Sequence, residues 1–583
     1  MANFFTDNED IVFLFGHMDL AAVARVQEDD FTRNTGPGAE YAPVDAADAI
    51  DHYRRILNIV GDIAGNQIAP RAEQVDLEGN TLNDDGTVTL GRGVRENLKV
   101  LSQADLMGFT LPRQYGGLNC PNVIYTMATE IISRADASLM NLFGLQGIAE
   151  TIYAFASDEI RNEYLPRFSS GEVTGAMVLT EPDAGSDLQA VSLRAWQDTD
   201  GQWRLNGVKR FITNGCGEIL LTLARSEPDV RDGRGLSLFL AERGPRVKVR
   251  HLEHKLGIHG SPTCELVYDD VPAKLIGERQ RGLVTYVMSL MNGARVGIAA
   301  QSLGIAEAAF RVARRYAHTR KQFGVPIERL PAVAEMVTDM KIAIEAARAL
   351  TYETARVCDL ENNNLRVLEL NKPTNADEVK RRKADARAFK RLNSMLTPMS
   401  KYYASEMCCR LAYDAIQVLG GSGYMTDYPS ERYLRDARIT TIYEGTSQLQ
   451  IVAAVRGVCS GAFEKRVDEF EQHVFADEML AGLKARLAEG KALVLKGIAA
   501  IKERGGDYMD LYGRRLVDSA IAVLVGHLFL LQAEANERKR HVARRFIEQS
   551  LPTIRRDIEL IGSGDQSAMQ QYEILAGPVP SVS

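Results

Sequence analysis

Residues 417–424 read QVLGGSGY, residues 435–438 read RDAR and residues 442–448 read IYEGTSQ. Glycine has no Cβ atom, so the glycine-rich first piece allows the backbone to approach a dinucleotide closely. A Gly-Gly-x-Gly run is weak evidence when it stands alone, and a single acid such as Glu444 before Gly-Thr is typical of a helix cap. The joint spacing of all three pieces is the most specific pattern in the chain.

Four further clusters precede this stretch. Loop-like residues near 180 carry turn formers and two hydroxyls, which suit a polar cofactor edge or an anion, although a plain turn has the same composition. Arginines near 320 suit a pyrophosphate because guanidinium donates two parallel charged hydrogen bonds, although such residues usually form a solvated surface. The clusters are MVLTEPDAGSD at 177–187, FITNG at 211–215, LGIHGSPT at 256–263, and NGAR at 292–295 with YAHTRKQFG at 316–324.

The first third of the chain has a helical pattern. Apolar residues recur at three- and four-residue spacing from 50 to 64, Asp45 can cap the start, and Pro70 predicts the end. We expect helices to about residue 174, preceded by an arm that contains Phe4 and Phe5. Further helical patterns lie at 98–107, 123–132 and 145–164.

Between about 175 and 290 the apolar period changes to two. Apolar residues alternate with polar ones at 191–195, 236–240 and 247–249. Asn206-Gly207 and Asp200-Gly201 predict hairpin turns, because both central positions of such turns favour positive φ. The pattern predicts an antiparallel sheet.

The helical period returns at 291 and continues through the rest of the chain. A charged stretch at 362–383 predicts a helix–helix connection on the surface. Heptad-like patterns at 463–500 and 509–538 predict additional helices after residue 456.

Composition narrows the class of protein. The 583 residues are 45% apolar and 25% charged, which excludes whole-chain disorder, and 69 basic against 77 acidic residues give a net charge of −8. This charge offers no general attraction to nucleic acid or anionic lipid. The seven cysteines contain no C-x-x-C pair, so we expect reduced thiols and no metal site.

Taken together, the five clusters resemble the acyl-CoA dehydrogenase family over about residues 100–456. The resemblance implies a mostly α fold with a central β domain, made of an N-terminal arm and helical domain, a middle β domain, a C-terminal helical bundle and a helical extension. The corresponding boundaries are 1–174, 175–290, 291–456 and 457–583. It also implies α,β-dehydrogenation of an acyl-CoA thioester to trans-2-enoyl-CoA, with hydride transfer to N5 of FAD.

In this resemblance Glu444 matches the catalytic base. A thioester α-proton is very weakly acidic, so the base must be positioned and desolvated to raise its pKa toward the working pH. The enolate oxygen must meet preorganised donors, which in the family are a flavin ribityl hydroxyl and the backbone amide of the base. Some relatives carry the base at the position of Ala294, which cannot take a proton, so Glu444 is the remaining candidate.

The resemblance further implies the binding residues. The Thr180 hydroxyl borders the isoalloxazine, Phe211 replaces a stacked tryptophan of relatives, and Arg320 with Gln322 reaches the partner subunit's FAD. The implied FAD set is Met177, Leu179, Thr180, Ser186, Phe211, Thr213, Arg320, Gln322, Phe323, Gln417, Leu419, Gly420, Gly421, Thr446 and Gln448. The implied substrate set is Ser186, Asn292, Arg295, Tyr443 and Gly445, and His259 is given no role.

Three rival functions share this fold. An acyl-CoA oxidase would keep Glu444 and differ in reoxidation by dioxygen. A glutaryl-CoA dehydrogenase needs an arginine where Met140 stands, which favours an uncharged acyl tail here. A DNA-binding flavoprotein needs a basic tail, but residues 456–583 hold 18 basic and 18 acidic side chains, so the dense run at 537–545 is better interpreted as a solvated helix face.

Partners and location follow from the same observations. We expect an acyl-CoA substrate of fatty-acid β-oxidation, electron transfer flavoprotein as acceptor, and no nucleic acid. The start of the chain lacks a basic signal region, and the apolar run 520–531 is too short to span a bilayer, so we expect a cytoplasmic protein without a transmembrane segment. The apolar extension predicts a homodimer, because larger relatives fold such a tail over the surface that tetramers use.

Overall fold

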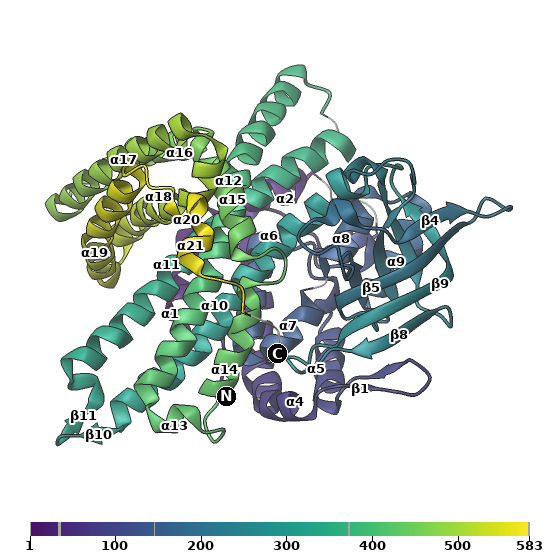
Figure 1. Cartoon of the computed structure of the whole chain (residues 1–583), viewed down its shortest axis with the longest axis horizontal. Coiled ribbons are helices and arrows are strands. Elements are labelled where there is room, and N and C mark those ends of the chain that lie inside the picture. Colours follow the sequence, from purple (N-terminus) through teal and green to yellow (C-terminus); the bar gives the residue numbers. More distant parts are fainter. Residues whose placement is uncertain (1, 33–36, 145, 371–372, 581–583) are drawn as a thin grey trace. The chain divides into compact units, whose positions relative to one another are not determined.

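The computed structural model describes residues 2–32, 37–144, 146–370 and 373–580 (Figure 1). The chain divides into two compact units. The first unit comprises Met1–Ala386 and Ala404–Thr446, and the second comprises Arg387–Tyr403 and Ser447–Ser583. The four-part division with boundaries at 174, 290 and 456 stays a prediction.

The first unit begins with helices, as predicted. The Asp45 carboxylate caps α3 by accepting a hydrogen bond of 2.9 Å from the backbone N–H of Asp48. A two-stranded ribbon of β1 (Thr81–Leu82) and β2 (Val88–Thr89) interrupts the series. The helices are α1 (Glu9–His17), α2 (Leu20–Gln27), α3 (Ala46–Ile63), α4 (Ala72–Glu78), α5 (Arg92–Gln103), α6 (Asn122–Ala135), α7 (Ala137–Phe143), α8 (Gln146–Phe155) and α9 (Asp158–Ser169).

The prediction that Pro70 ends the first helix is wrong. α3 already ends at Ile63, and the chain continues through helical turns at Ala64–Ile68 and Ala69–Arg71 into α4. Pro70 lies at the start of the second of these turns. A proline is tolerated there because the first N–H groups of a helical turn have no intrahelical acceptor to lose.

A seven-stranded sheet follows and confirms the predicted β domain. Its strands run in the order β3-β6-β4-β5-β9-β7, with β8 paired to β9. Most pairs are antiparallel, but β3 pairs with β6 in parallel because the intervening strands act as a crossover connection. The strands are β3 (Gly175–Val178), β4 (Arg194–Gln197), β5 (Trp203–Thr213), β6 (Ile219–Arg225), β7 (Leu236–Glu242), β8 (Val247–Leu252) and β9 (Thr263–Ile276).

Of the two predicted hairpin turns, one is confirmed and one is wrong. Gly201, with φ of 78°, turns the chain between β4 and β5. Asn206-Gly207 instead lies inside β5, where the register against β9 shifts between Leu205 and Gly207. Gly207 has φ of 144° and absorbs a β-bulge, because the residues after it go on pairing with β9.

Helices complete the first unit. The predicted surface connection at 362–383 is wrong in its extent, because α11 continues to Leu370, α12 begins at Ala376, and Asn363, Asn364 and Arg382 are buried. Of the residues between the two helices, 373–375 are described and 371–372 lie outside the described residues. A small ribbon of β10 (Lys321–Gln322) and β11 (Val325–Pro326) separates α10 from α11. The helices are α10 (Met288–Thr319), α11 (Pro331–Leu370), α12 (Ala376–Leu419), whose residues 387–403 count with the second unit, α13 (Gly421–Tyr424) and α14 (Ser430–Ala437).

A buried cluster of charges joins four of these helices. Arg348 in α11 has no exposed surface, and its guanidinium lies 2.6 Å from Asp10 of α1 and 2.6 Å from Glu130 of α6. The same guanidinium lies 3.0 Å from Glu307 of α10, and the Tyr352 hydroxyl donates to Glu130 at 2.7 Å. One cation thus holds carboxylates from three other helices.

The second unit is a helical bundle, in agreement with the predicted extension. α17, α18 and α19 pack against one another, and Leu480, Leu483 and Leu487 of α17 are buried. The helices are α15 (Ser447–Cys459), α16 (Ala462–Glu471), α17 (Glu478–Arg504), α18 (Gly506–Ala535), α19 (Glu537–Gly562), α20 (Ser567–Gln570) and α21 (Tyr572–Ala576).

Among the residues that the structure describes, two helical segments are long and apolar enough to cross a membrane, Gly282–Thr319 and Gly506–Ala535. Their most apolar windows are 44% and 78% buried within the protein. Length and composition are weak indications, since the core helices of globular proteins meet the same criteria. The apolar residues of 520–531 lie in α18 and most of them are buried.

His527 lies in the core of the second unit and predicts acid sensitivity there. Its imidazole is 2% exposed and stacks on Phe470 with ring centroids 5.4 Å apart. Burial, assisted by the charges of Lys484 and Lys491, lowers the pKa of His527 to about 4. The unfolded chain therefore binds more protons than the folded one between about pH 6.5 and 4. Stability falls by about 3 kcal/mol as the pH drops through this window.

Replacing His527 with phenylalanine keeps the stacked ring and removes the titration. We expect His527→Phe to flatten the loss of stability between pH 6.5 and 4, measured by hydrogen exchange of α18 amides. His541, which is 80% exposed, provides the control, and His541→Gln should keep the wild-type slope. An unchanged slope in His527→Phe would show that another group causes the acid sensitivity.

Candidate active site

Glu444 lies in a constrained turn near the end of the first unit. Its φ is 56° and that of Gly445 is 89°, so two consecutive residues adopt left-handed backbone conformations. Glycine tolerates this geometry, whereas for a glutamate it costs about 1–3 kcal/mol. Such strain persists where surrounding contacts fix the backbone, and it is common at functional sites.

The neighbouring Tyr443 is held by a buried polar cluster. Its hydroxyl donates to Gln301 Oε1 of α10 and lies 3.2 Å from Asn141 Oδ1 of α7. Gln301 Nε2 donates to the Ala137 carbonyl at 2.8 Å and to Asn141 Oδ1 at 3.1 Å, while Asn141 Nδ2 donates to Ser261 Oγ at 3.1 Å. Burial and the charge of Glu444 raise the pKa of Tyr443, so the phenol stays protonated.

Arg295 of α10 shares this site with Glu444. Its Nη1 donates to Asn292 Oδ1 at 3.1 Å, and its Nε is buried without a hydrogen-bond partner among the residues that the structure describes. Burial lowers the pKa of Arg295, and the negative charge of Glu444 opposes that effect. The cation and the carboxylate therefore interact, and Arg295 keeps a donor available to a bound group.

A buried ion pair fixes the loop after β3. Lys209 Nζ on β5 lies 3.0 Å from Glu181 Oε1 and donates to the Leu179 carbonyl at 2.7 Å. Burial lowers the pKa of Lys209 to about 8, while Lys209 and two backbone N–H groups outweigh burial and lower the pKa of Glu181. The backbone N–H of Arg210 donates to the Thr180 carbonyl at 2.9 Å. The pair therefore pins Thr180 against β5.

Sequence reasoning missed both members of this pair. Glu181 lies within the cluster at 177–187, and Lys209 is a cation at a strand position whose neighbours on the same face are apolar. A buried lysine needs an anionic partner, so its place on an inward strand position was the available signal.

Phe211 lies at a second irregularity in the pairing of β5 with β9. The register against β9 shifts between Lys209 and Ile212, and Phe211 has φ of 60°. Its side chain is 54% exposed, with the Arg210 guanidinium 4.7 Å from the ring centroid. A bulge that re-aims an aromatic outward leaves a face free for another ring.

The residues around 320 and 420 are also accessible. Phe323, with φ of 52°, tips the β10–β11 ribbon and is 90% exposed, and Arg320 and Gln322 beside it are exposed. Gly420 has φ of 62°, and a Cβ atom added at Gly420 or Gly421 would meet no atom within 4 Å. Open space therefore adjoins the glycine-rich turn.

A single chain does not bring all of these residues together. Arg295 and Arg320 lie 25 residues apart along and just beyond α10, which corresponds to about 37 Å at 1.5 Å per residue. Thr180 and Phe211 gather on the β domain, and Arg295, Tyr443 and Glu444 gather at α10. The remaining predicted residues differ in exposure. Ser186, Asn292, Gln417 and, in the second unit, Gln448 are exposed, and Met177, Thr213, Gly445 and Thr446 are half-buried. Leu179 and Leu419 are buried.

His259 has a structural place. Its Nδ1 lies 2.9 Å from Asp76 Oδ1, and its Nε2 lies 3.0 Å from the Lys255 carbonyl. Asp76 also accepts from Arg435 Nη2 at 2.7 Å. The imidazole thus ties the loop at 256–263 to α4.

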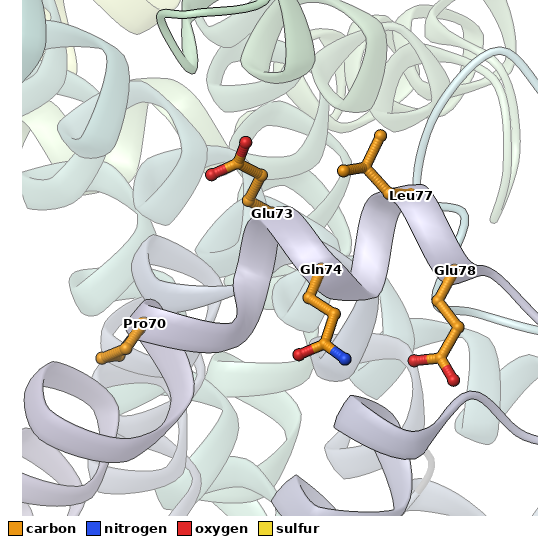
Figure 2. Close-up of a pocket in the computed structure, with 5 residues that line it drawn as sticks. All are labelled: Pro70, Glu73, Gln74, Leu77 and Glu78. Atoms are coloured by element: carbon orange, nitrogen blue, oxygen red, sulfur yellow. The ribbon is translucent and has the colours of Figure 1, made fainter.

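Glu444 does not line either of two hollows in the structure. One, of about 430 Å³, runs along α4; Figure 2 shows Glu73 and Leu77 on one side of the helix and Gln74 and Glu78 on the other, with Pro70 at its start. The other, of about 460 Å³, lies in the second unit between α15, α18 and α19. Within the described ranges, no group of three or more His, Cys, Asp or Glu side chains could hold a metal ion.

Family profiles match most of the chain. Those described as the acyl-CoA dehydrogenase N-terminal, middle and C-terminal domains match residues 51–172, 176–271 and 281–458. A fourth, described as acyl-CoA dehydrogenase C terminal, matches residues 459–563. The chain belongs to the acyl-CoA dehydrogenase family, whose members are FAD-dependent oxidoreductases, and the predicted resemblance and fold class are confirmed.

Individual relatives agree with this assignment. An acyl-CoA dehydrogenase of Bacillus subtilis is 38% identical over 400 residues, which are 67% of this chain and 94% of the relative. The structure of butyryl-CoA dehydrogenase from Megasphaera elsdenii is 31% identical, covers 69% of this chain and 97% of its own, and has a TM-score of 0.58. An acyl-CoA dehydrogenase from Bacillus anthracis complexed with FAD, at 24% identity, covers 91% of this chain and 92% of its own, with a TM-score of 0.74, and shows the shared fold.

Proposed function

We propose that the chain is an FAD-dependent acyl-CoA dehydrogenase that converts an acyl-CoA thioester to trans-2-enoyl-CoA. The observation that carries the proposal is the strained backbone at Glu444, whose carboxylate interacts electrostatically with the half-buried Arg295 in a member of this family. An acid held in a disfavoured conformation, next to a donor without a partner, suits a base that works on a bound substrate.

Several features fit FAD. The exposed face of Phe211 can stack on a ring, and the open space at Gly420 and Gly421 admits a close backbone approach. The residues that would hold FAD are Met177, Leu179, Thr180, Ser186, Phe211, Thr213, Arg320, Gln322, Phe323, Gln417, Leu419, Gly420, Gly421, Thr446 and Gln448. When bound, FAD supplies a two-electron acceptor for the hydrogen on the substrate β-carbon.

The chain's own residues would supply the acid–base chemistry. The Glu444 carboxylate takes the α-proton of the thioester, and the backbone N–H of Glu444 can donate to the developing enolate oxygen. Arg295 orients the substrate through its Nε, which has no hydrogen-bond partner among the described residues. Ser186, Asn292, Tyr443 and Gly445 complete the proposed substrate set.

Anaerobic titration tests this function. FAD-loaded protein is mixed with straight, branched, alicyclic and dicarboxylic acyl-CoA thioesters, and loss of yellow flavin absorbance is recorded. We expect bleaching by uncharged acyl chains and enoyl-CoA as product, because Met140 is buried and apolar where a dicarboxylic substrate would need a cation. Protein that stays colourless after FAD is added, or a flavin that no thioester bleaches, would contradict the proposal.

The electron acceptor forms a separate part of the proposal. We expect electron transfer flavoprotein to reoxidise the enzyme, and a cytoplasmic location in fatty-acid β-oxidation. Turnover with that flavoprotein should be much faster than hydrogen peroxide formation in air. The reverse order of rates would favour an acyl-CoA oxidase.

We also propose a homodimer. The exposed Phe323, on a ribbon that also exposes Arg320 and Gln322, is an apolar side chain of the kind that protein interfaces bury. Light scattering should give a mass near twice 64.4 kDa. Phe323→Glu should shift that mass toward the monomer, whereas Tyr572→Glu, at another exposed aromatic, should not. A wild-type mass near four times the chain mass would contradict the dimer.

A further inference from the structure

The buried side chains that hold Tyr443, which are Gln301, Asn141 and Ser261, have no part in the chemistry described above. Gln301 and Ser261 have no exposed surface, and Asn141 is almost completely buried. Burying polar groups is unfavourable unless their hydrogen bonds are made, and apolar side chains of similar size would fill the same space without that cost. The cluster therefore fixes the positions of its side chains and adds little to the stability of the fold.

The hydrogen bonds of the cluster fix the position of Gln301 Oε1, which accepts from the Tyr443 hydroxyl. Gln301 Nε2 donates to both the Ala137 carbonyl and Asn141 Oδ1, and this pair of acceptors fixes which way the amide faces. Gln301 Oε1 is consequently directed at the Tyr443 hydroxyl, which donates to it. Gln301 projects from α10, a helix of 32 residues, so its own position is rigid.

We propose that Gln301 is a positioning residue for the base Glu444, acting through the Tyr443 hydroxyl. The inference rests on the proposed function of Glu444. Glu444 holds a left-handed conformation that a residue with a side chain adopts only under constraint. The residue directly before them is anchored by its side chain to α7 and α10, so the turn cannot relax without breaking these hydrogen bonds.

The same arrangement ties the base to the β domain. Asn141, which accepts from Gln301, donates to Ser261 in the loop before β9. Thr263, at the start of β9, pairs with Thr213 of β5, a strand that also carries Phe211. The cluster thus connects the turn of Glu444 with the elements proposed to face the flavin ring.

The test compares four variants in stopped-flow reduction of FAD-saturated enzyme by an acyl-CoA that bleaches wild type. Gln301→Leu and Tyr443→Phe each break the Gln301–Tyr443 hydrogen bond, and each should lower the first-order rate constant about 10- to 100-fold, as expected for a base displaced by about 1 Å. The half-saturating acyl-CoA concentration should change little in Gln301→Leu, because Gln301 is not one of the proposed substrate residues. The double variant should be no slower than the slower single variant, because both changes remove one interaction.

Ser302→Ala is the matched control. Ser302 follows Gln301 in α10, is equally buried, and donates only to the Ile298 carbonyl of its own helix at 2.8 Å. Its rate constant should equal that of wild type. Additive losses in the double variant, or an unchanged rate constant in both single variants, would overturn the proposal.

A second measurement does not depend on turnover. Hydrogen exchange of the full-length, FAD-loaded protein should be faster at the amides of 443–446 in Gln301→Leu and Tyr443→Phe, and unchanged there in Ser302→Ala. Tyr443→Phe removes a single oxygen atom, so it keeps the test available if Gln301→Leu folds poorly. Unchanged exchange in Tyr443→Phe would overturn the proposal. If Glu444→Gln still reduces its flavin at the wild-type rate, the assignment of Glu444 as the base fails, and if no thioester bleaches the wild-type flavin, the proposed function fails; both are distinct results.

Discussion

Replacing Glu444 with glutamine is expected to lower the rate of flavin reduction by acyl-CoA by at least about 10²–10⁴-fold, the usual contribution of a general base. Glutamine has nearly the same shape and can occupy the same turn, but its amide cannot accept the α-proton. Binding of FAD and acyl-CoA should therefore remain close to wild type. Stopped-flow absorbance with saturating acyl-CoA, combined with equilibrium binding of the enoyl-CoA product, measures both quantities.

A control separates this effect from loss of a surface charge. Glu278 has a side chain that is 76% exposed and pairs only with a neighbouring exposed arginine. Glu278→Gln should reduce its flavin at the wild-type rate. A Glu444→Gln variant that matches this control would show that the base lies elsewhere.

Replacing Arg348 with methionine is expected to be the most destabilising of the substitutions considered. The change leaves Asp10, Glu130 and Glu307 without the cation that they share, in a place with almost no access to water. Breaking a buried ion pair by removing one partner typically costs about 3–5 kcal/mol. Burial already raises the pKa of Glu130, so part of the cost will appear as proton uptake by these carboxyls.

The measurement is the urea midpoint of the first unit, followed by hydrogen exchange of α6 and α11 at pH 7 and pH 5. The loss in Arg348→Met should be smaller at pH 5, because protonated carboxyls no longer need the cation. Arg55→Met is the control, since Arg55 pairs with Asp51 on the surface and such pairs contribute about 0–1 kcal/mol. Equal losses of stability in the two variants would show that the buried cluster around Arg348 contributes no more to stability than a surface ion pair.

Both effects follow from contacts that sequence patterns do not show. Glu444 was identified because its neighbours in the chain form a specific motif, but its left-handed backbone and the hydrogen bonds of Tyr443 were not predictable from that motif. Arg348 lies in a helical pattern where a cation usually faces water. Its burial results from three acids that are 41 to 338 residues away in the chain.

Two predictions from short sequence motifs were wrong because the neighbouring segments of the fold continue through them. Asn206-Gly207 has the composition of a hairpin turn, yet β9 offers a continuous partner on both sides of the pair, and the glycine forms a bulge within β5. Pro70 has the composition of a helix end, yet the helical turns continue because proline fits the first positions of a new turn. In both cases the residue type restricts the backbone angles, and the neighbouring segments decide how those angles are used.

The sequence by itself determined the order of helices, sheet and further helices, the family, and the candidate base, because these depend on periodicity and on motifs whose members are close in the chain. The tertiary structure alone decided that Lys209 is buried against Glu181, that Arg348 gathers three carboxylates, and that Gln301 faces Tyr443. Each of these contacts joins residues on different elements. A pattern within one segment specifies which side chains face inward, but the partner that each one meets depends on how distant segments pack.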